Sequence, residues 1–191
     1  MVNEAGAWDG FHVPSAPLTP EQVEQSREVA HLRERATQHL TLNGLEFAYR
    51  SPMVGTLNVV AAPMSATVVE EEGSLGAVEG RVTFSPLYEG PPGCVHGGFV
   101  AAYFDEVLGM VQALSGRPGM TASLSVNYRS PTPLLKPLVF RAKLERVEGR
   151  KVFTSATLHH GTTLCADATA VFVSMSAELL ERLIKIRQAS A

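Results

Sequence analysis

Cysteine and net basic charge are both scarce in this sequence. The 191 residues include only two cysteines, Cys94 and Cys165, which are too few for a disulfide framework and favour a reducing compartment. Sixteen Lys and Arg residues against nineteen Asp and Glu residues give a formal net charge of −3. A nucleic-acid-binding domain normally presents a basic face, so we expect no nucleic-acid partner.

Targeting and cofactor signals are also missing. The first residues show neither the basic start nor the apolar run of a secretory signal, so a cytoplasmic location is expected. No metal-ligand spacing, phosphate-binding loop or dinucleotide fingerprint occurs, and His159 and His160 would point to opposite faces of a strand. We therefore expect neither a metal nor a cofactor.

The segment 97–114 comes nearest to a membrane span, because Asp105 and Glu106 are its only ionised residues. It is at the short edge of a spanning length, and two carboxylates near its middle are expensive in lipid. The sequence predicts instead a helix at about 96–115 that is buried inside the protein, and no membrane span.

Residues 1–60 are expected to form an N-terminal extension. Within it, Thr19 can cap a helix, Pro20 suits the first helical position, and Gln22 completes a capping box. A charged surface helix is therefore predicted over about 20–40. Residues 61–191 are expected to form the main domain.

Alternation of apolar and polar residues from residue 66 onwards predicts six strands. Two of them precede the apolar helix and four follow it, with hairpin turns at Glu148-Gly149 and His160-Gly161. In the strand 121–128, strict alternation places Thr121 on the opposite face from Tyr128.

One apolar helix among six mostly antiparallel strands can be buried only if the sheet wraps around it, which is an α+β arrangement. The alternation excludes a parallel βαβ sheet, whose strands would read as continuous apolar runs. A final amphipathic helix, capped by Ser176, is expected to turn Leu179, Leu183 and Ile184 inward.

The segment around His96-Gly97-Gly98 has the strongest chemical signal. Two glycines at a helix start leave unobstructed N–H groups, which suit a carbonyl oxygen or a developing oxyanion. Asp105 follows within the same apolar helix, where a buried carboxylate is costly unless it is paired or used. The plainer alternative is that the glycines allow close packing, His96 caps the helix and Asp105 reaches solvent.

The His-Gly-Gly motif, with an Asp nine residues after the His, resembles the hotdog-fold thioesterases of the phenylacetate-pathway type. That group includes the human thioesterase superfamily members that hydrolyse acyl-CoA. Residues 120–124 and 127–131 fit the strand after the central helix, and 147–151 fit a later hairpin. The resemblance covers about residues 66–175 and implies an antiparallel sheet of about six strands around the helix.

The resemblance also implies an acyl-CoA substrate and a role for each motif residue. Asp105 would be the catalytic carboxylate, acting as a general base or as a nucleophile. The N–H of Gly97, with that of Gly98, would polarise the thioester carbonyl. His96 would orient the substrate or the helix start, and Thr121 would position a water molecule.

Three further residues are candidates for substrate binding. Glu89 lies near the place where some relatives carry an Asn or Gln. Arg150 and Lys151, at a predicted hairpin, are either solvated turn residues or ligands of the coenzyme A phosphates.

Helix geometry predicts that the site is shared between subunits. His96 and Asp105 point to opposite sides of one helix and lie about 13.5 Å apart along its axis. Two such helices, antiparallel across a two-fold axis, would bring Asp105 of one subunit to the helix start of the other. We therefore expect a homodimer, or a tetramer made of two dimers.

Other functions remain as alternatives. Enoyl-CoA hydratases of this fold carry a His five residues after the Asp, where this chain has Met110. A non-catalytic acyl-CoA sensor would lose the carboxylate and would usually carry a DNA-binding extension, and 20–40 shows no helix-turn-helix. Cys94 as a thiol nucleophile is disfavoured, because neighbours on a loop rarely face each other.

Overall fold

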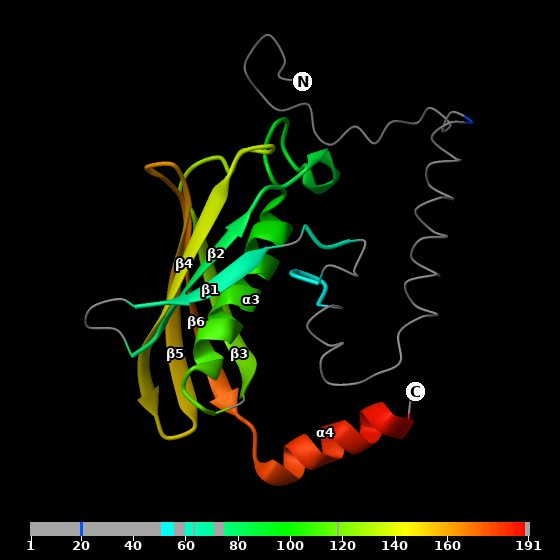
Figure 1. Cartoon of the computed structure of the whole chain (residues 1–191), viewed down its shortest axis with the longest axis vertical. Coiled ribbons are helices and arrows are strands. Elements are labelled where there is room, and N and C mark those ends of the chain that lie inside the picture. Colours follow the sequence, from blue (N-terminus) through cyan, green and yellow to red (C-terminus); the bar gives the residue numbers. More distant parts are fainter. Residues whose placement is uncertain are drawn as a thin grey trace. The chain divides into compact units, whose positions relative to one another are not determined.

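The computed structural model describes Pro20 and residues 51–55, 60–62, 64–70, 75–117 and 119–189 (Figure 1). The predicted charged helix at 20–40 and most of the proposed extension 1–60 lie outside the described residues. The division at residue 60 therefore stays a prediction.

The described chain forms one antiparallel sheet and two α-helices, as the α+β prediction requires. The sheet order is β1-β2-β4-β5-β6-β3, and every pair of neighbours is antiparallel. In chain order the elements are β1 (Ser65–Val69), β2 (Ala77–Val82), the short 3-10 helix η1 (Pro86–Tyr88), α3 (Gly97–Ala113), β3 (Gly119–Tyr128), β4 (Leu138–Glu148), β5 (Lys151–His160), β6 (Thr163–Ser174) and α4 (Ala177–Ala189).

The central helix α3 packs its apolar face against the sheet, which curves behind it in Figure 1. Tyr103, Phe104 and Leu108 on this face are fully buried, as is Phe140 of β4. Burying a side chain of this size contributes about 1.5–3 kcal/mol, so this layer supplies much of the stability. The predicted buried helix and the sheet around it are both confirmed.

Glycine at one position lets β2 approach α3 closely. A Cβ added to Gly80 would lie 2.6 Å from Met64 Sδ and 3.2 Å from Val107 Cγ1. A side chain here would force the Met64 side chain to move and would press tightly against Val107 of α3.

A β-bulge in β3 overturns the predicted alternation of its side chains. Thr121 pairs with Phe172 and Ser123 with Val171, so one extra residue, Ala122, is accommodated between them. A bulge of this kind shifts the side-chain phase by one residue. Thr121 consequently faces α3, on the same side of the sheet as Tyr128, and the prediction that they lie on opposite faces is wrong.

The prediction for the final helix is also wrong in its packing. The expected inward residues Leu179, Leu183 and Ile184 are 36%, 38% and 47% exposed, and α4 packs extensively against no other described element. The amphipathic pattern correctly indicates a helix, but it does not specify what covers the apolar face. Within the described residues, no helix is both long and apolar enough to cross a membrane.

Candidate active site

The start of α3 leaves one backbone N–H group without an acceptor among the described residues. His96 is the N-cap residue, and its Nδ1 accepts a hydrogen bond from the Gly98 N–H at 3.0 Å. The N–H groups of Phe99 and Val100 donate to the His96 carbonyl. Among the described residues, the Gly97 N–H has no acceptor, and it lies at the positive end of the helix dipole.

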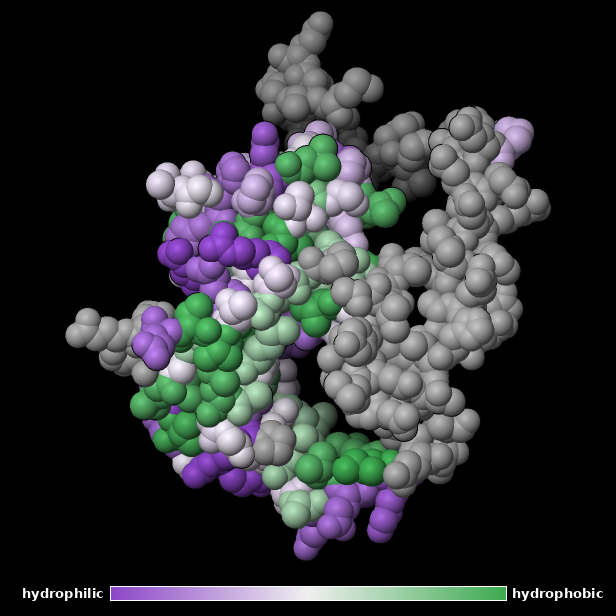
Figure 2. All heavy atoms as spheres, in the orientation of Figure 1, coloured by the Kyte–Doolittle hydropathy of each residue, from purple (hydrophilic) through white to green (hydrophobic). Residues whose placement is uncertain are grey.

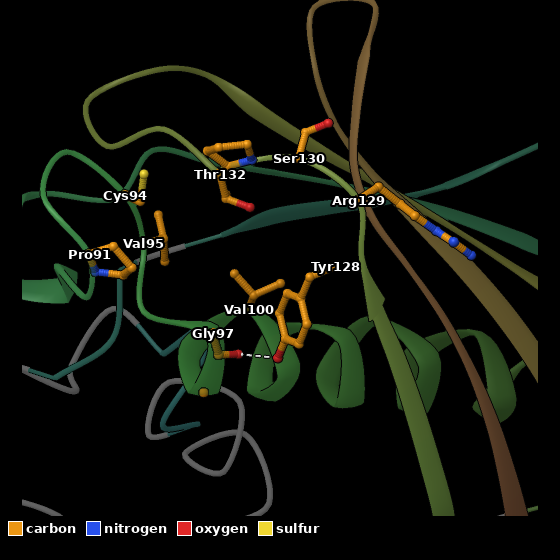
Figure 3. A pocket seen from close by; sticks show the side chains of 11 residues that line it. Pro91, Cys94, Val95, Gly97, Val100, Tyr128, Arg129, Ser130 and Thr132 are labelled. Atoms are coloured by element: carbon orange, nitrogen blue, oxygen red, sulfur yellow. Dashed lines mark hydrogen bonds between the residues drawn. The ribbon is translucent and has the colours of Figure 1, made fainter. Parts of the chain in front are cut away.

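A pocket of about 560 Å³ opens at this helix start (Figure 3). The loop 91–95 and the segment 128–132 form its walls; its lining includes Cys94, Val95, Gly97, Gly98, Val100, Tyr128 and Thr132. The Tyr128 hydroxyl donates to the Gly97 carbonyl at 2.7 Å and holds the end of β3 against the helix. Arg129 also lines the pocket, but Figure 3 shows its side chain pointing away from Gly97.

Asp105 and Thr121 form a second polar cluster further along α3. The Thr121 hydroxyl donates to Asp105 Oδ1 at 2.9 Å, and the Asp105 side chain is partly exposed. The bulge in β3 makes this contact possible because it turns Thr121 towards the helix. No hydrogen bond from the described residues engages the second carboxylate oxygen, which can therefore accept one from a water molecule or a substrate.

Glu106, next to Asp105, has a different environment. Its Oε2 accepts a hydrogen bond of 3.3 Å from the hydroxyl of Ser51, a buried residue. Burial raises the pKa of Glu106, the Ser51 hydroxyl opposes that shift, and the Asp105 carboxylate adds to it. The sequence contained no signal for this contact, because Ser51 lies 55 residues earlier in the chain.

The two clusters are too far apart to act together within one chain. Gly97 and Asp105 lie on one unbroken helix, about 12 Å apart along its axis. Their partners on β3, Tyr128 and Thr121, are separated by about 20 Å along the strand.

Glu89 contacts the loop of the pocket rather than the pocket itself. Its Oε1 accepts a hydrogen bond from the Gly93 N–H at 2.7 Å and closes the turn 89–94. Gly93 has a φ of 74°, a left-handed conformation that favours glycine. This geometry gives Glu89 a role in shaping the loop, and its contact with substrate stays a prediction.

Arg150 and Lys151 lie at the opposite end of the sheet from the pocket. Arg150 Nε and Nη2 donate to the Ser174 carbonyl at 3.2 and 2.9 Å, and Lys151 is exposed at the start of β5. Arg117, which sequence reasoning missed, donates to the Gly149 carbonyl of the same hairpin. We call Arg117, Arg150 and Lys151 the basic corner. It lies at the Ala113 end of α3.

The other reactive side chains of the described residues form no separate metal or thiol site. Burial raises the pKa of Cys165, so this thiol is not an activated nucleophile. Cys94 is half-buried in the pocket wall. Within the described residues, no three His, Cys, Asp or Glu side chains gather as metal ligands.

An antiparallel sheet packed around one central helix is the hotdog fold, which defines the class of this protein. The model of the family described as "Thioesterase superfamily" matches residues 92–166. The solved structure of RHA08564, a thioesterase superfamily protein, is 31% identical with a TM-score of 0.67, covering 83% of this chain and 86% of that one. The chain belongs to the thioesterase superfamily.

Curated relatives match over part of their length. Acyl-coenzyme A thioesterase THEM4 of Xenopus laevis is 40% identical over 92 residues, which are 47% of this chain and 41% of that protein. Human acyl-coenzyme A thioesterase THEM5 is 32% identical over 92 residues, 47% of this chain and 37% of that protein. The chain thus spans about two fifths of these relatives. A Streptococcus mutans protein solved with acetyl-CoA has the same fold, with 18% identity, a TM-score of 0.52, and coverage of 59% of this chain and 90% of that one.

Proposed function

We propose that the protein hydrolyses acyl-CoA thioesters to a free acid and coenzyme A, in composite sites of a homodimer. The observation that carries the proposal is the unpaired Gly97 N–H at the pocket, together with a carboxylate, Asp105, on the same helix but out of its reach. The names of the curated relatives and of the structural neighbours support the substrate class.

The Gly97 N–H would polarise the thioester carbonyl. Its hydrogen bond strengthens as the carbonyl oxygen becomes an oxyanion, so it stabilises the transition state more than the ground state. Gly98 contributes through the helix dipole rather than through its own N–H, because that group already donates to His96. His96 holds the helix start in this geometry as its N-cap.

Asp105 would activate the attack on the carbonyl carbon. As a general base it takes a proton from water while the oxygen of that water adds to the carbon. The C–S bond then breaks, and the proton passes to the departing thiolate. As a nucleophile, the carboxylate itself adds to the carbon, the C–S bond breaks to release the coenzyme A thiolate, and the resulting anhydride is then hydrolysed by water, which supplies the proton that the thiolate takes up. Thr121 orients the Asp105 carboxylate by its hydrogen bond in either case.

A two-fold axis would bring the two clusters together. In an antiparallel pair of α3 helices, Asp105 and Thr121 of one subunit approach the Gly97 N–H of the other. The edge strand β3 supports this arrangement, because most of its residues are exposed in the single chain and its outer backbone edge is open. The basic corner of the subunit that supplies Asp105 would then hold the coenzyme A phosphates.

Thiol release from a panel of acyl-CoA substrates tests the proposal, with Asp105→Asn as the decisive variant. Asn is nearly isosteric with Asp but can neither attack nor accept a proton, so a loss of about 10²–10⁴-fold is expected. Glu106→Gln removes the neighbouring carboxylate from the same helix and serves as the matched control with near-normal turnover. If Asp105→Asn keeps turnover within tenfold of the wild type, the assignment is wrong.

A further inference from the structure

The C-terminal helix α4 presents an exposed apolar face and packs extensively against no other described element. Leu179, Leu183 and Ile184 are exposed on one side of the helix, whereas Glu178, Glu181, Arg182 and Lys185 lie on the other. Figure 2 shows this separation as a band of hydrophobic side chains along α4 beside a row of hydrophilic ones. A helix with this pattern normally buries its apolar side against a partner surface.

The position of α4 restricts which surface it can reach. It follows β6, whose last residue, Ser174, pairs with Gly119 at the start of the edge strand β3. The helix therefore leaves the sheet at the Ala113 end of α3, and Figure 1 shows it projecting away from the sheet.

A second exposed apolar surface of the same subunit lies near the opposite end of α3. Leu87, Tyr128 and Leu135 are 86%, 55% and 63% exposed. All three lie near the Gly97 end of α3. The Tyr128 hydroxyl donates to the Gly97 carbonyl. The Leu135 N–H donates to the carbonyl of Phe84, which is close in sequence to Leu87 in η1. We call these three residues the apolar rim of the pocket.

We propose that α4 of one subunit docks on the apolar rim of a second copy of this chain. The inference rests on the antiparallel dimer of the proposed function, which places the Ala113 end of one α3 beside the Gly97 end of the other. Within one chain the two surfaces are separated by the length of α3, about 25 Å. In the dimer they become neighbours, and α4, about 20 Å long, spans the remaining gap.

The docked helix would also lie next to the mouth of the partner's pocket, because Tyr128 belongs both to the apolar rim and to the pocket lining. Each subunit would thus contribute Asp105, Thr121 and α4 to the composite site that contains the Gly97 N–H of the other subunit.

Cysteine cross-linking in the full-length chain tests the docking. In a Cys94→Ser background, which leaves the buried Cys165 as the only native thiol, Leu183→Cys is combined with Leu135→Cys and oxidised. A disulfide-linked dimer on a non-reducing gel is expected. The matched control combines Leu135→Cys with Glu181→Cys, on the opposite side of α4, and should yield little linked dimer. Efficient linkage in the control, or none in the test pair, would overturn the docking.

Sedimentation measurements separate this inference from the proposed function. Leu183→Glu is expected to raise the dimer dissociation constant about tenfold or more, since it places a charge in a desolvated contact. If the wild-type protein is an active dimer and Leu183→Glu leaves the dimer dissociation constant unchanged, the docking is overturned and the composite site stands. A wild-type chain that is active as a monomer would instead overturn the composite site. A Leu183→Cys cross-link to Leu32→Cys in the same chain would show that the predicted helix 20–40 covers α4, and would overturn the docking.

Discussion

Complementation between two inactive variants is the sharpest test of the composite site. Asp105→Asn removes the carboxylate, and Gly97→Pro removes the N–H group. The structure indicates that proline is tolerated at position 97, because this is the first residue of α3 and proline is favoured there. His96 has φ −60° and ψ 131°, the extended conformation that a residue before proline prefers.

Each variant alone is expected to be nearly inactive. Loss of an oxyanion donor costs about 10²–10³ in kcat, and loss of a general base about 10²–10⁴. A side chain at position 97 would also approach the Tyr128 ring to 3.3 Å. Gly97→Ala is therefore the matched control, since it makes the same approach but keeps the N–H group. It should retain most of the activity that Gly97→Pro loses.

Mixing the two variants should restore activity in a calculable amount. Random pairing makes half of the dimers heterodimers, and each of these has one intact site and one site with both defects. About a quarter of wild-type activity is expected. The assay is thiol release from an acyl-CoA, and heterodimers purified from the mixture with two different affinity tags should show about half of wild-type activity. If verified heterodimers are as inactive as their parents, the shared-site reasoning is refuted.

Three further predictions concern residues around the site. Replacing both Arg150 and Lys151 with Ala should raise KM for acyl-CoA more than it lowers kcat. The increase in KM should be smaller for a thioester without the nucleotide. An equal increase for both substrates would count against phosphate binding. Thr121→Ala should lower kcat about tenfold while Thr121→Ser stays near wild type, since a hydrogen bond to a charged group contributes about 1.5–3 kcal/mol; equal rates would remove Thr121 from the site. Because burial raises the pKa of Glu106, its contribution to stability is complete below the unfolded pKa and is lost as the pH rises past the raised value. Glu106→Gln, which still accepts from Ser51, should therefore melt at a higher temperature than wild type at about pH 8 but not at about pH 4, and a constant difference in Tm would contradict this.

Sequence periodicity was sufficient for the six strands, for the central helix and for the class of fold. The apolar run 97–113 could be buried only by a surrounding sheet, and the structure has that arrangement. Local signals also located the helix start, because an N-cap and adjacent glycines act through backbone groups within a few residues.

Contacts between distant segments could not be predicted in the same way. Tyr128 meets Gly97 across 31 residues, and Arg117 meets the hairpin at Gly149 across 32. Neither contact has a periodic or motif signal, because each depends on how the whole sheet closes around α3. The face of Thr121 was mispredicted for a related reason, since a single inserted residue leaves hydropathy almost unchanged but reverses the side-chain phase.

The bulge at Ala122 changes which positions of β3 turn their side chains towards α3. Odd-numbered positions face the helix before the bulge, and even-numbered positions face it afterwards. One strand thereby orients Thr121 towards Asp105 at one end and Tyr128 towards Gly97 at the other. Without the bulge, the odd separation of seven positions would place Thr121 and Tyr128 on opposite faces of the sheet, and only one of them could face α3. The register shift at Ala122 therefore keeps both polar clusters on the same face of one strand.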